Sequence, residues 1–352
     1  MAGDPGGEPR GRPEDRPGRL SGIQPLPPPA AYEAINVYTR IIVDEALRRG
    51  IAVEITDPAR GGLVLRQGGR TVRTFESLSE LTSAVAFRIC DDKGLTRDVL
   101  QRAGIPVAPG RRATFDAADV DFLARQEELV VKPVRGEQGR GVTVGVTTPE
   151  ELDRAREEAR RWCADVLLER RCPGEDLRVL VIAAEVVAAS VRRPAQVTGD
   201  GRHTVAELVD ARSRARQEAT DGASRIPLDD TTRRVVEAAG YKLDDVVEDG
   251  VVLAVRRTAN LHTGGTIHDV TDELHPALGQ AAVAVARAID IPVVGVDLVA
   301  DGVDRPGFVV IEANEQPGLA NHEPRPTAQR FLSLLFPRDD VSDAIRGRVD
   351  LS

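Results

Sequence analysis

The sequence predicts an α+β fold, in which short strands that pair as hairpins alternate with capped helices. Two β-branched runs at 293–300 and 307–313 flank a turn rich in Asp, Gly and Pro, which is typical of a β-hairpin. A second pair of apolar strands, near 129–133 and 142–146, flanks a glycine-rich loop, so that loop is followed by a strand rather than by a helix. Helical periodicity at 32–50 and 276–289 places helices between such pairs.

The composition limits the class of protein. With 352 residues, 41% of them hydrophobic, the chain can bury a core spread over two or three subdomains. A net charge of -9 and an aromatic content of 3% argue against a nucleic-acid partner. Three cysteines without CxxC spacing and no apolar run of about 20 residues indicate a reduced, cytoplasmic protein without a membrane partner.

The first 90 residues divide into a tail and a small domain. Residues 1–30 are rich in Pro, Gly and Arg and are expected to be disordered. Residues 31–90 are expected to form a small α/β domain: a helix ending at Gly50, a strand at 51–55 and a hairpin around Gly68-Gly69. Ser77 and Glu80 have the spacing of a capping box for a helix that ends near Cys90.

The next helix begins with a lysine. Asp91-Asp92 precede Lys93, and the helix is expected to stop at Gly104. A cation in the first turn is disfavoured by the helix dipole, so Lys93 indicates an anion beyond the helix end. An exposed lysine that reaches water is the alternative.

The loop at 133–142 has the sequence PVRGEQGRGV. Its glycines allow backbone N–H groups to approach an anion, with Lys132 at the end of the incoming strand. We interpret it as a phosphate-covering flap, expected to make 134–141 the most mobile internal segment; an ordinary hairpin tip is the alternative.

Further along, a capped helix is expected from Thr148 to about Trp162, then strands at 166–168, 177–182 and 186–191. Thr204 and Glu207 are expected to cap another helix, and 216–250 reads as a charged, partly helical insertion. A strand at 251–255 leads into RRTANLHTGGT, a loop suited to closing over a ligand. Residues 337–352 are expected to form a frayed tail.

The hairpin at 293–313 carries candidate metal ligands. Counting outward from the turn sets Asp297 opposite Glu312, and Asn314 leaves the same face as Glu312. Oxygen-only ligands suit Mg²⁺, which keeps water and phosphate in its other positions. An acidic hairpin end in solvent is the alternative, although Asp297 interrupts an apolar strand, where an unpaired carboxylate is costly.

Taken together, these segments resemble the ATP-grasp superfamily: a lysine at a helix start, KPxxGxxGxGV, ERRCPGED after a strand, RRTANLHTGG and D-x14-E-x-N, in this order over 91–322. The resemblance implies two α/β subdomains that clamp ATP, preceded by the small α/β domain. Residues 91–175 would form the lid subdomain and 176–336 the subdomain for metal and substrate.

The resemblance also assigns roles. ATP would be bound by Lys93, Lys132, Gly136, Gly139, Gly141, Glu169, Arg171, Cys172 and Asp176, with Glu175 as a second candidate for the ribose. Two Mg²⁺ ions, or Mn²⁺ in their place, would be held by Asp297, Glu312 and Asn314. Arg257, Lys132 and Asn260 would be catalytic. The substrates would contact Arg192, His262, Thr263, Gly264, Gly265, Asn321 and His322, although a surface ion pair is an equal alternative for Arg192.

Within the superfamily, VTGDGRHTVAELV and RRTANLHTGGT are similar to cyanophycin synthetase and bifunctional glutathione synthetase. CDDKGLTRDVL, KPVRGEQGRGVTVGV and IEANEQPGLANHEPRPTAQRF are more similar to the ligase half of N-acetylglutaminylglutamine synthetases. The implied reaction joins N-acetylglutamine to glutamine, with N-acetylation expected from a separate enzyme. The same chemistry on other amino acids or dipeptides and a nucleotide-binding module without turnover are the alternatives. A homodimer is an open option for its assembly.

Overall fold

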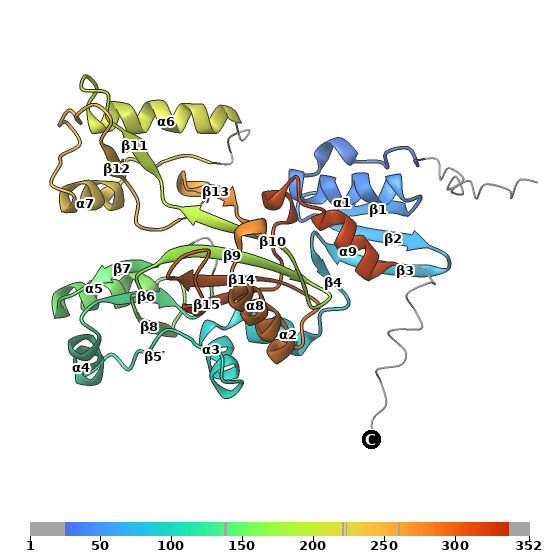
Figure 1. The fold of residues 1–352 in the computed structure, drawn as a ribbon, viewed down its shortest axis with the longest axis horizontal. Helices are drawn as coiled ribbons and strands as arrows, with labels where there is room; N and C mark the ends of the chain where they lie inside the picture. Colours follow the sequence, from blue (N-terminus) through green and yellow to red (C-terminus); the bar gives the residue numbers. More distant parts are fainter. Residues whose placement is uncertain (1–24, 137–138, 220–221, 223, 260, 338–352) are drawn as a thin grey trace, which may run out of the picture.

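The computed structural model describes residues 25–136, 139–219, 222, 224–259 and 261–337. It confirms the α+β prediction, because helices pack against antiparallel sheets throughout (Figure 1). The predicted tails fall mostly outside this part of the chain: residues 1–24 and 338–352 are not among the described residues. Residues 25–30 are described, and the Leu26 amide donates a hydrogen bond to the Leu47 carbonyl.

The N-terminal sheet has four antiparallel strands in the order β1-β2-β3-β4. They are β1 (Ala52–Asp57), β2 (Gly62–Gln67), β3 (Arg70–Phe75) and β4 (Leu78–Ser79), preceded by η1 (Tyr32–Ala34) and α1 (Val37–Arg48). Helix α1 is capped by Asn36 and ends just before Gly50, whose φ of +69° is the left-handed conformation that glycine adopts without strain. The expected helix, strand and hairpin are therefore confirmed.

The predicted capping box at Ser77 is wrong. Helix α2 (Ala84–Asp91) begins later, and its N-cap is Ser83, which accepts a hydrogen bond from the Ala86 amide. Ser77 is buried and donates to the Pro317 carbonyl at 2.7 Å. The Ser77 hydroxyl thus bonds to Pro317, far away in the sequence, and not to the start of a neighbouring helix as the local spacing predicted.

The second sheet has the order β5-β8-β6-β7. Its strands are β5 (Gly110–Arg112), β6 (Leu129–Pro133), β7 (Thr143–Val146) and β8 (Val166–Arg170), and its helices are α4 (Ala117–Gln126) and α5 (Pro149–Arg160). The capping box of Thr148 and Glu151 is confirmed at the start of α5. Strand β5 and helix α4 lie in a stretch for which the sequence patterns predicted no element.

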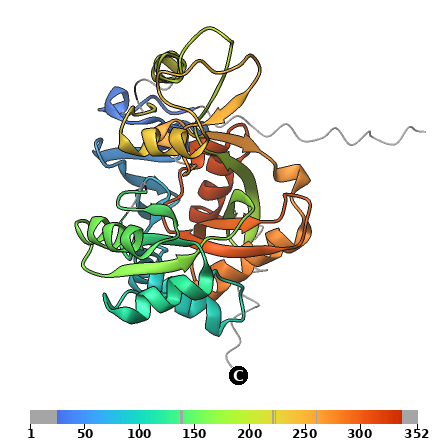
Figure 2. The ribbon, with the colours of Figure 1, turned by 90° about the vertical axis from the view of Figure 1, so that its left-hand side faces the viewer.

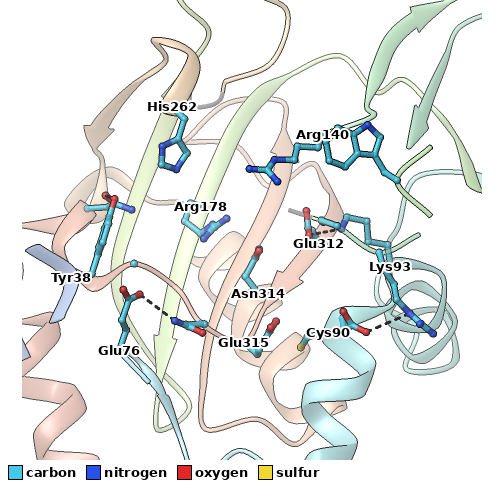
Figure 3. Close-up of a pocket in the computed structure, with 17 residues that line it drawn as sticks. Tyr38, Glu76, Cys90, Lys93, Arg140, Arg178, His262, Glu312, Asn314 and Glu315 are labelled. Carbon is cyan, nitrogen blue, oxygen red and sulfur yellow. Dashed lines mark hydrogen bonds and ion pairs between the residues drawn. The ribbon is translucent and has the colours of Figure 1, made fainter. Parts of the chain in front are cut away.

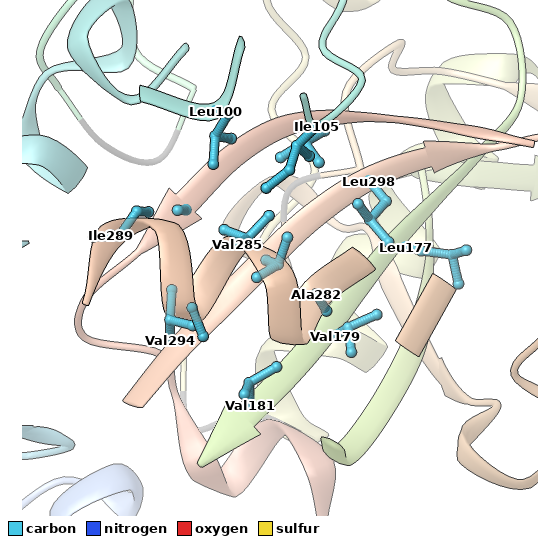
Figure 4. Close-up of a cluster of buried hydrophobic side chains, with 14 of the residues drawn as sticks. Leu100, Ile105, Leu177, Val179, Val181, Ala282, Val285, Ile289, Val294 and Leu298 are labelled. Atoms are coloured by element: carbon cyan, nitrogen blue, oxygen red, sulfur yellow. The ribbon is translucent and has the colours of Figure 1, made fainter. Parts of the chain in front are cut away.

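The central sheet has five strands in the order β13-β10-β9-β14-β15. They are β9 (Glu175–Ile182), β10 (Glu185–Arg193), β13 (Thr266–Asp269), β14 (Val293–Ala300) and β15 (Phe308–Asn314). Helix α8 (Pro276–Ile289) covers one face, where Val285 and Ile289 pack against strand residues such as Val179 and Leu298 (Figure 4). Helix α3 (Lys93–Arg102) adds Leu100 to this core.

Residues 195–255 form an inserted unit with its own apolar core. Strands β11 (Gln196–Thr198) and β12 (Val252–Ala254) pair, and α6 (Val205–Ala219) and α7 (Asp230–Ala238) lie beside them (Figure 1). The expected helix at Thr204 and the charged insertion both belong to this unit. The remaining elements are η2 (Leu261–Thr263), η3 (Thr271–Glu273), η4 (Leu319–His322) and α9 (Thr327–Leu335).

The two faces of strand β9 pack against different parts of the molecule. Leu177, Val179 and Val181 point to the α8 side, so the alternate residues point to the other side. Of these, Leu180 and Ile182 are buried in a core shared with α1, the N-terminal sheet and α9. Figure 2 shows the N-terminal part and α9 lying together beside the central sheet. Arg178, nearer the other end of the same face, lines a cavity.

Within the described ranges, no helix has both the length and the apolar character needed to cross a bilayer.

Candidate active site

A cavity of about 660 Å³ lies where the N-terminal sheet, the second sheet and the central sheet meet. Figure 3 shows Lys93, Glu312 and Arg140 at one end, Tyr38 and Glu76 at the other, and Asn314 and Arg178 between them. Several predicted site residues line it, and these are Lys93, Gly136, His262, Glu312, Asn314 and Asn321. Elements from across the chain therefore converge on one space.

The predicted hairpin of β14 and β15 is confirmed, including its register. Asp297 lies directly opposite Glu312, and Asn314 is two residues further along β15. The Asn314 side-chain amide lies 3.4 Å from an Asp297 carboxylate oxygen. The three side chains thus share the face of the central sheet that borders the cavity.

Asp297 is buried and held by two arginines. Arg178 donates to both carboxylate oxygens, and Arg192 lies 3.0 Å from one of them. Burial alone raises the pKa of Asp297, but the charges of Arg178 and Arg192 outweigh it and keep that pKa below the usual range. Gly295 leaves room for this arrangement, because a Cβ there would lie 2.9 Å from an Arg178 nitrogen. Asp297 is therefore a carboxylate whose charge is already balanced.

Lys93 meets the anion that its position at the start of α3 predicted. Its ammonium lies 3.0 Å from a Glu312 carboxylate oxygen and donates to the Gly136 carbonyl at 2.8 Å (Figure 3). The Lys93 side chain is 9% exposed and that of Glu312 is 27% exposed. Lys93 thus contacts both Glu312, a candidate metal ligand, and Gly136, at the beginning of the glycine loop.

The donor set suits a hard divalent cation. Two carboxylates and one amide oxygen are a ligand set that Mg²⁺ accepts while it keeps water or phosphate in its other positions. In the described ranges, no three His, Cys, Asp or Glu side chains cluster closely enough to bind a metal, so a site here depends on Asn314. Lys93 and the arginines now neutralise Glu312 and Asp297, and a cation bound there would replace those contacts.

Lys132 and Glu169 form a buried ion pair behind the cavity. Their charged atoms are 2.6 Å apart, and each side chain is less than a tenth exposed. Arg97 approaches the same carboxylate at 3.8 Å and also donates to the Ala108 carbonyl. Lys132 does not line the cavity in this structure, so its role in binding phosphate stays a prediction.

The glycine loop adopts conformations that require glycine. The φ angles of Gly136, Gly139 and Gly141 are +133°, +72° and +69°. The predicted mobile segment 134–141 includes residues 137 and 138, which lie outside the described residues.

The residues predicted to hold adenine and ribose lie on β8, on β9 and on the turn between them, which carries Arg171 and Cys172. Arg171 pairs with Glu128 at 2.9 Å, and the Cys172 thiol lies 3.7 Å from the Arg170 carbonyl. Asp176 pairs with Arg192 at 2.8 Å. The ion-pair alternative for Arg192 is therefore present in this structure: its partners are Asp297, with 8% of its side chain exposed, and Asp176, with 39% exposed.

The residues of the loop at 256–265 contact different parts of the molecule. His262 lines the cavity, whereas Gly264 packs against Ile226 of the inserted unit and the Gly265 carbonyl accepts from Arg216 at 2.6 Å. Thr263 is partly buried in η2, and Asn260 lies outside the described residues. Arg257 extends to the second sheet, where its guanidinium lies 3.5 Å from the Val144 carbonyl.

Of the two predicted substrate residues in η4, Asn321 lines the cavity and His322 does not. Asn321 accepts a hydrogen bond from the Tyr38 hydroxyl at 3.2 Å, which links η4 to α1. His322 is 5% exposed, and its Nδ1 has no hydrogen-bond partner among the described residues. Burial, with the nearby charge of Arg178, lowers the pKa of His322 to about 4.

Sequence patterns missed several cavity residues, namely Tyr38, Glu76, Trp162 and Arg178. Arg178 had a detectable signal, because it interrupts an apolar strand in the way that Asp297 does. Tyr38 and Glu76 had none, since only the docking of the N-terminal sheet brings them to the cavity.

Comparison with known proteins identifies the fold. A model of the RimK-like ATP-grasp domain matches residues 245–327. The crystal structure of a bifunctional glutathione synthetase from Pasteurella multocida covers 88% of this chain with a TM-score of 0.63 and 28% sequence identity. The chain has the ATP-grasp fold and contains a RimK-like ATP-grasp domain. The predicted family and fold are thereby confirmed, including the likeness to glutathione and cyanophycin synthetases.

Two curated relatives show the extent of this similarity. A cyanophycin synthetase from Nostoc sp. is 34% identical over 322 residues, which is 87% of this chain and 36% of that protein. The glutathione biosynthesis bifunctional protein GshAB from Clostridium perfringens is 29% identical over 87% of this chain and 42% of that protein. The ATP-grasp chain described here thus spans less than half the length of these relatives.

Proposed function

We propose that this ATP-grasp protein is an ATP-dependent carboxylate–amine ligase. The observation that carries the proposal is the charged face of the central sheet. There Glu312 and Asn314 border a cavity together with Lys93 and Arg178. Glu312 is paired with Lys93, and Asp297, on the same face, is paired with Arg178. Such a face can hold a triphosphate, a divalent cation and a carboxylate side by side. The names of two related proteins, a cyanophycin synthetase and a bifunctional glutathione synthetase, support the same class of reaction.

The reaction has two steps. An oxygen of the acid substrate's carboxylate attacks the γ-phosphorus of ATP, the bond to the bridging oxygen breaks, and ADP leaves. The nitrogen of the amine substrate then attacks the carbonyl carbon of the acyl phosphate. Phosphate leaves, the amine loses a proton, and an amide bond has formed. Phosphoryl transfer of this kind needs positioning and charge neutralisation more than covalent chemistry from the protein.

The side chains of the cavity would supply that neutralisation. Lys93 and Arg140 border the end where Glu312 lies, and Arg178 lies between that end and Tyr38 (Figure 3). Mg²⁺ bound by Glu312, Asn314 and Asp297 would withdraw charge from the phosphate oxygens. Lys132 and Arg257 are the further residues proposed to face the transferred phosphate.

For the substrates, we propose N-acetylglutamine as the acid and glutamine as the amine. The support is the similarity of segments 90–100, 132–146 and 311–331 to N-acetylglutaminylglutamine synthetases. The second candidate is the same chemistry on other amino acids or peptides, and it is favoured by the 34% identity to a cyanophycin synthetase. Both candidates share the acyl-phosphate route.

The test is ADP release by the purified chain with ATP and Mg²⁺, for pairs of acids and amines. We expect ADP release to require both substrates and a product mass equal to their sum less water. ADP release without an amine would instead indicate an acyl kinase or an ATPase. Turnover only with other amino acids would favour the second candidate.

A further inference from the structure

Trp162 is the only tryptophan of the chain, and it borders the cavity just after α5 with 52% of its surface exposed. Its amide donates to the Ala159 carbonyl at 3.1 Å, which fixes it to the last turn of the helix. A large aromatic side chain left half exposed at a polar cavity calls for an explanation, because the apolar core of this sheet is formed by other residues.

The ring contacts the end of the glycine loop from two sides. The Arg140 guanidinium lies 5.6 Å from the ring centroid, within the range of a cation–π interaction. Gly141 lies between the ring and β6, since a Cβ on it would be 2.5 Å from Trp162 Cδ1 and 3.0 Å from Pro133 Cγ. The turn that contains both residues is closed by a hydrogen bond from the Val142 amide to the Gly139 carbonyl.

The position of Arg140 in the cavity indicates what its contact with Trp162 does. Arg140 borders the cavity at the same end as Lys93 and Glu312 (Figure 3). The face of the Trp162 ring, 5.6 Å from the Arg140 guanidinium, can therefore orient that guanidinium at this end of the cavity.

We infer that Trp162 is a positioning residue for nucleotide binding: its ring holds Arg140 and Gly141 so that the Arg140 guanidinium faces the phosphate groups. The inference rests on the proposed function, because it needs the nucleotide to occupy this cavity. Trp162 itself would act through Arg140 rather than on the reacting atoms.

The test is calorimetric titration with the ATP analogue in which a methylene group replaces the β–γ bridging oxygen, in the presence of Mg²⁺. Trp162→Ala should weaken binding about two- to fivefold, the range expected for loss of a partly exposed cation–π contact. Trp162→Phe should restore most of the affinity, because it keeps an aromatic face. Arg160→Ala is the matched control: Arg160 lies 4.6 Å from the Phe115 ring on the same subdomain but does not border the cavity, so affinity should not change.

A double-mutant cycle separates positioning from simple packing. If Trp162 acts through Arg140, the pair Arg140→Ala and Trp162→Ala should bind the analogue no more weakly than Arg140→Ala alone. Additive losses, or a Trp162→Ala protein that binds like the unsubstituted chain, would overturn the inference and leave the ligase proposal standing. An unsubstituted chain that does not bind the analogue would overturn both.

A second readout needs no substitution. Because the chain has one tryptophan, its fluorescence reports on this ring alone. Saturation with the analogue should change the emission, and an emission that stays the same at calorimetric saturation would contradict the placement of the ring at the phosphate end.

Discussion

Individual side chains of the cavity are arranged as paired charges. Glu312 is paired with Lys93, and Asp297 with Arg178 and Arg192. A carboxylate with a cationic partner can stay ionised in a partly buried site, and the partner can later turn to a phosphate. The charges required for binding a nucleotide and a metal are therefore already present in a balanced form.

Glu312 tests the metal proposal most simply. Glu312→Gln removes one negative charge at nearly constant volume, and we expect ADP release to fall at least about a hundredfold. Stability should change by no more than about 1 kcal/mol, because the pair with Lys93 is partly exposed. The control is Glu185→Gln. Glu185 lies on strand β10 of the same sheet and forms an exposed ion pair with Arg330 of helix α9, so this variant should keep full turnover. Undiminished ADP release by Glu312→Gln would contradict the metal role.

The buried pair of Lys132 and Glu169 predicts a stability effect. Lys132→Met leaves the Glu169 carboxylate with only Arg97, 3.8 Å away, and should cost about 3–5 kcal/mol in the free energy of unfolding. Replacing both with apolar residues, Lys132→Met with Glu169→Met, should recover much of that loss because no uncompensated charge remains. Urea unfolding of the two variants measures the difference. Equal stabilities would show that Glu169 does not depend on Lys132.

His322 predicts a pH dependence of stability. Its folded pKa of about 4 lies below 6.5, the ordinary pKa of histidine, so the unfolded chain binds the proton first as the pH falls. Stability from this residue is complete above pH 6.5 and should be lost between pH 6.5 and 4, by up to about 3 kcal/mol. His322→Gln should remove that slope. If both proteins lose stability equally over this window, His322 is not the group responsible.

At the scale of elements, register and turn chemistry explain which predictions succeeded. The opposition of Asp297 and Glu312 was predictable, because strand pairing follows from counting residues outward from one turn. Ser77 was mispredicted, since its partner is the Pro317 carbonyl rather than a neighbour in sequence. Tyr38 and Glu76 reach the cavity through packing between distant elements, and no local pattern contains that information.

Gly145 of strand β7 lies where Arg257 approaches the second sheet, which makes the role of Arg257 testable. Gly145 has a φ of +86°, and a Cβ there would lie 2.0 Å from an Arg257 nitrogen. Gly145→Ala should therefore strain the backbone by about 1–2 kcal/mol and displace Arg257. If Arg257 is catalytic, Gly145→Ala should lower turnover in the same direction as Arg257→Ala. Gly104→Ala, also at positive φ but with open space around it, is the control for strain alone and should lose stability while keeping turnover.

At the scale of the molecule, three sheets meet at one cavity. The N-terminal sheet supplies Glu76, the second sheet brings the glycine loop with Arg140, and the central sheet supplies Glu312 and Asn314. Figure 1 shows how far apart these parts lie along the chain. The sequence motifs predicted the residues at the Lys93 and Glu312 end of this cavity better than those at the opposite end, where the N-terminal part contributes.

The claim that the chain forms an acyl phosphate can be measured directly. The acid substrate is labelled with oxygen-18 in its carboxylate and incubated with the chain, ATP, Mg²⁺ and the amine, and the released phosphate is analysed by mass spectrometry. The proposed reaction transfers one carboxylate oxygen to each phosphate released with the amide product. Phosphate without the label, alongside amide product, would contradict the mechanism.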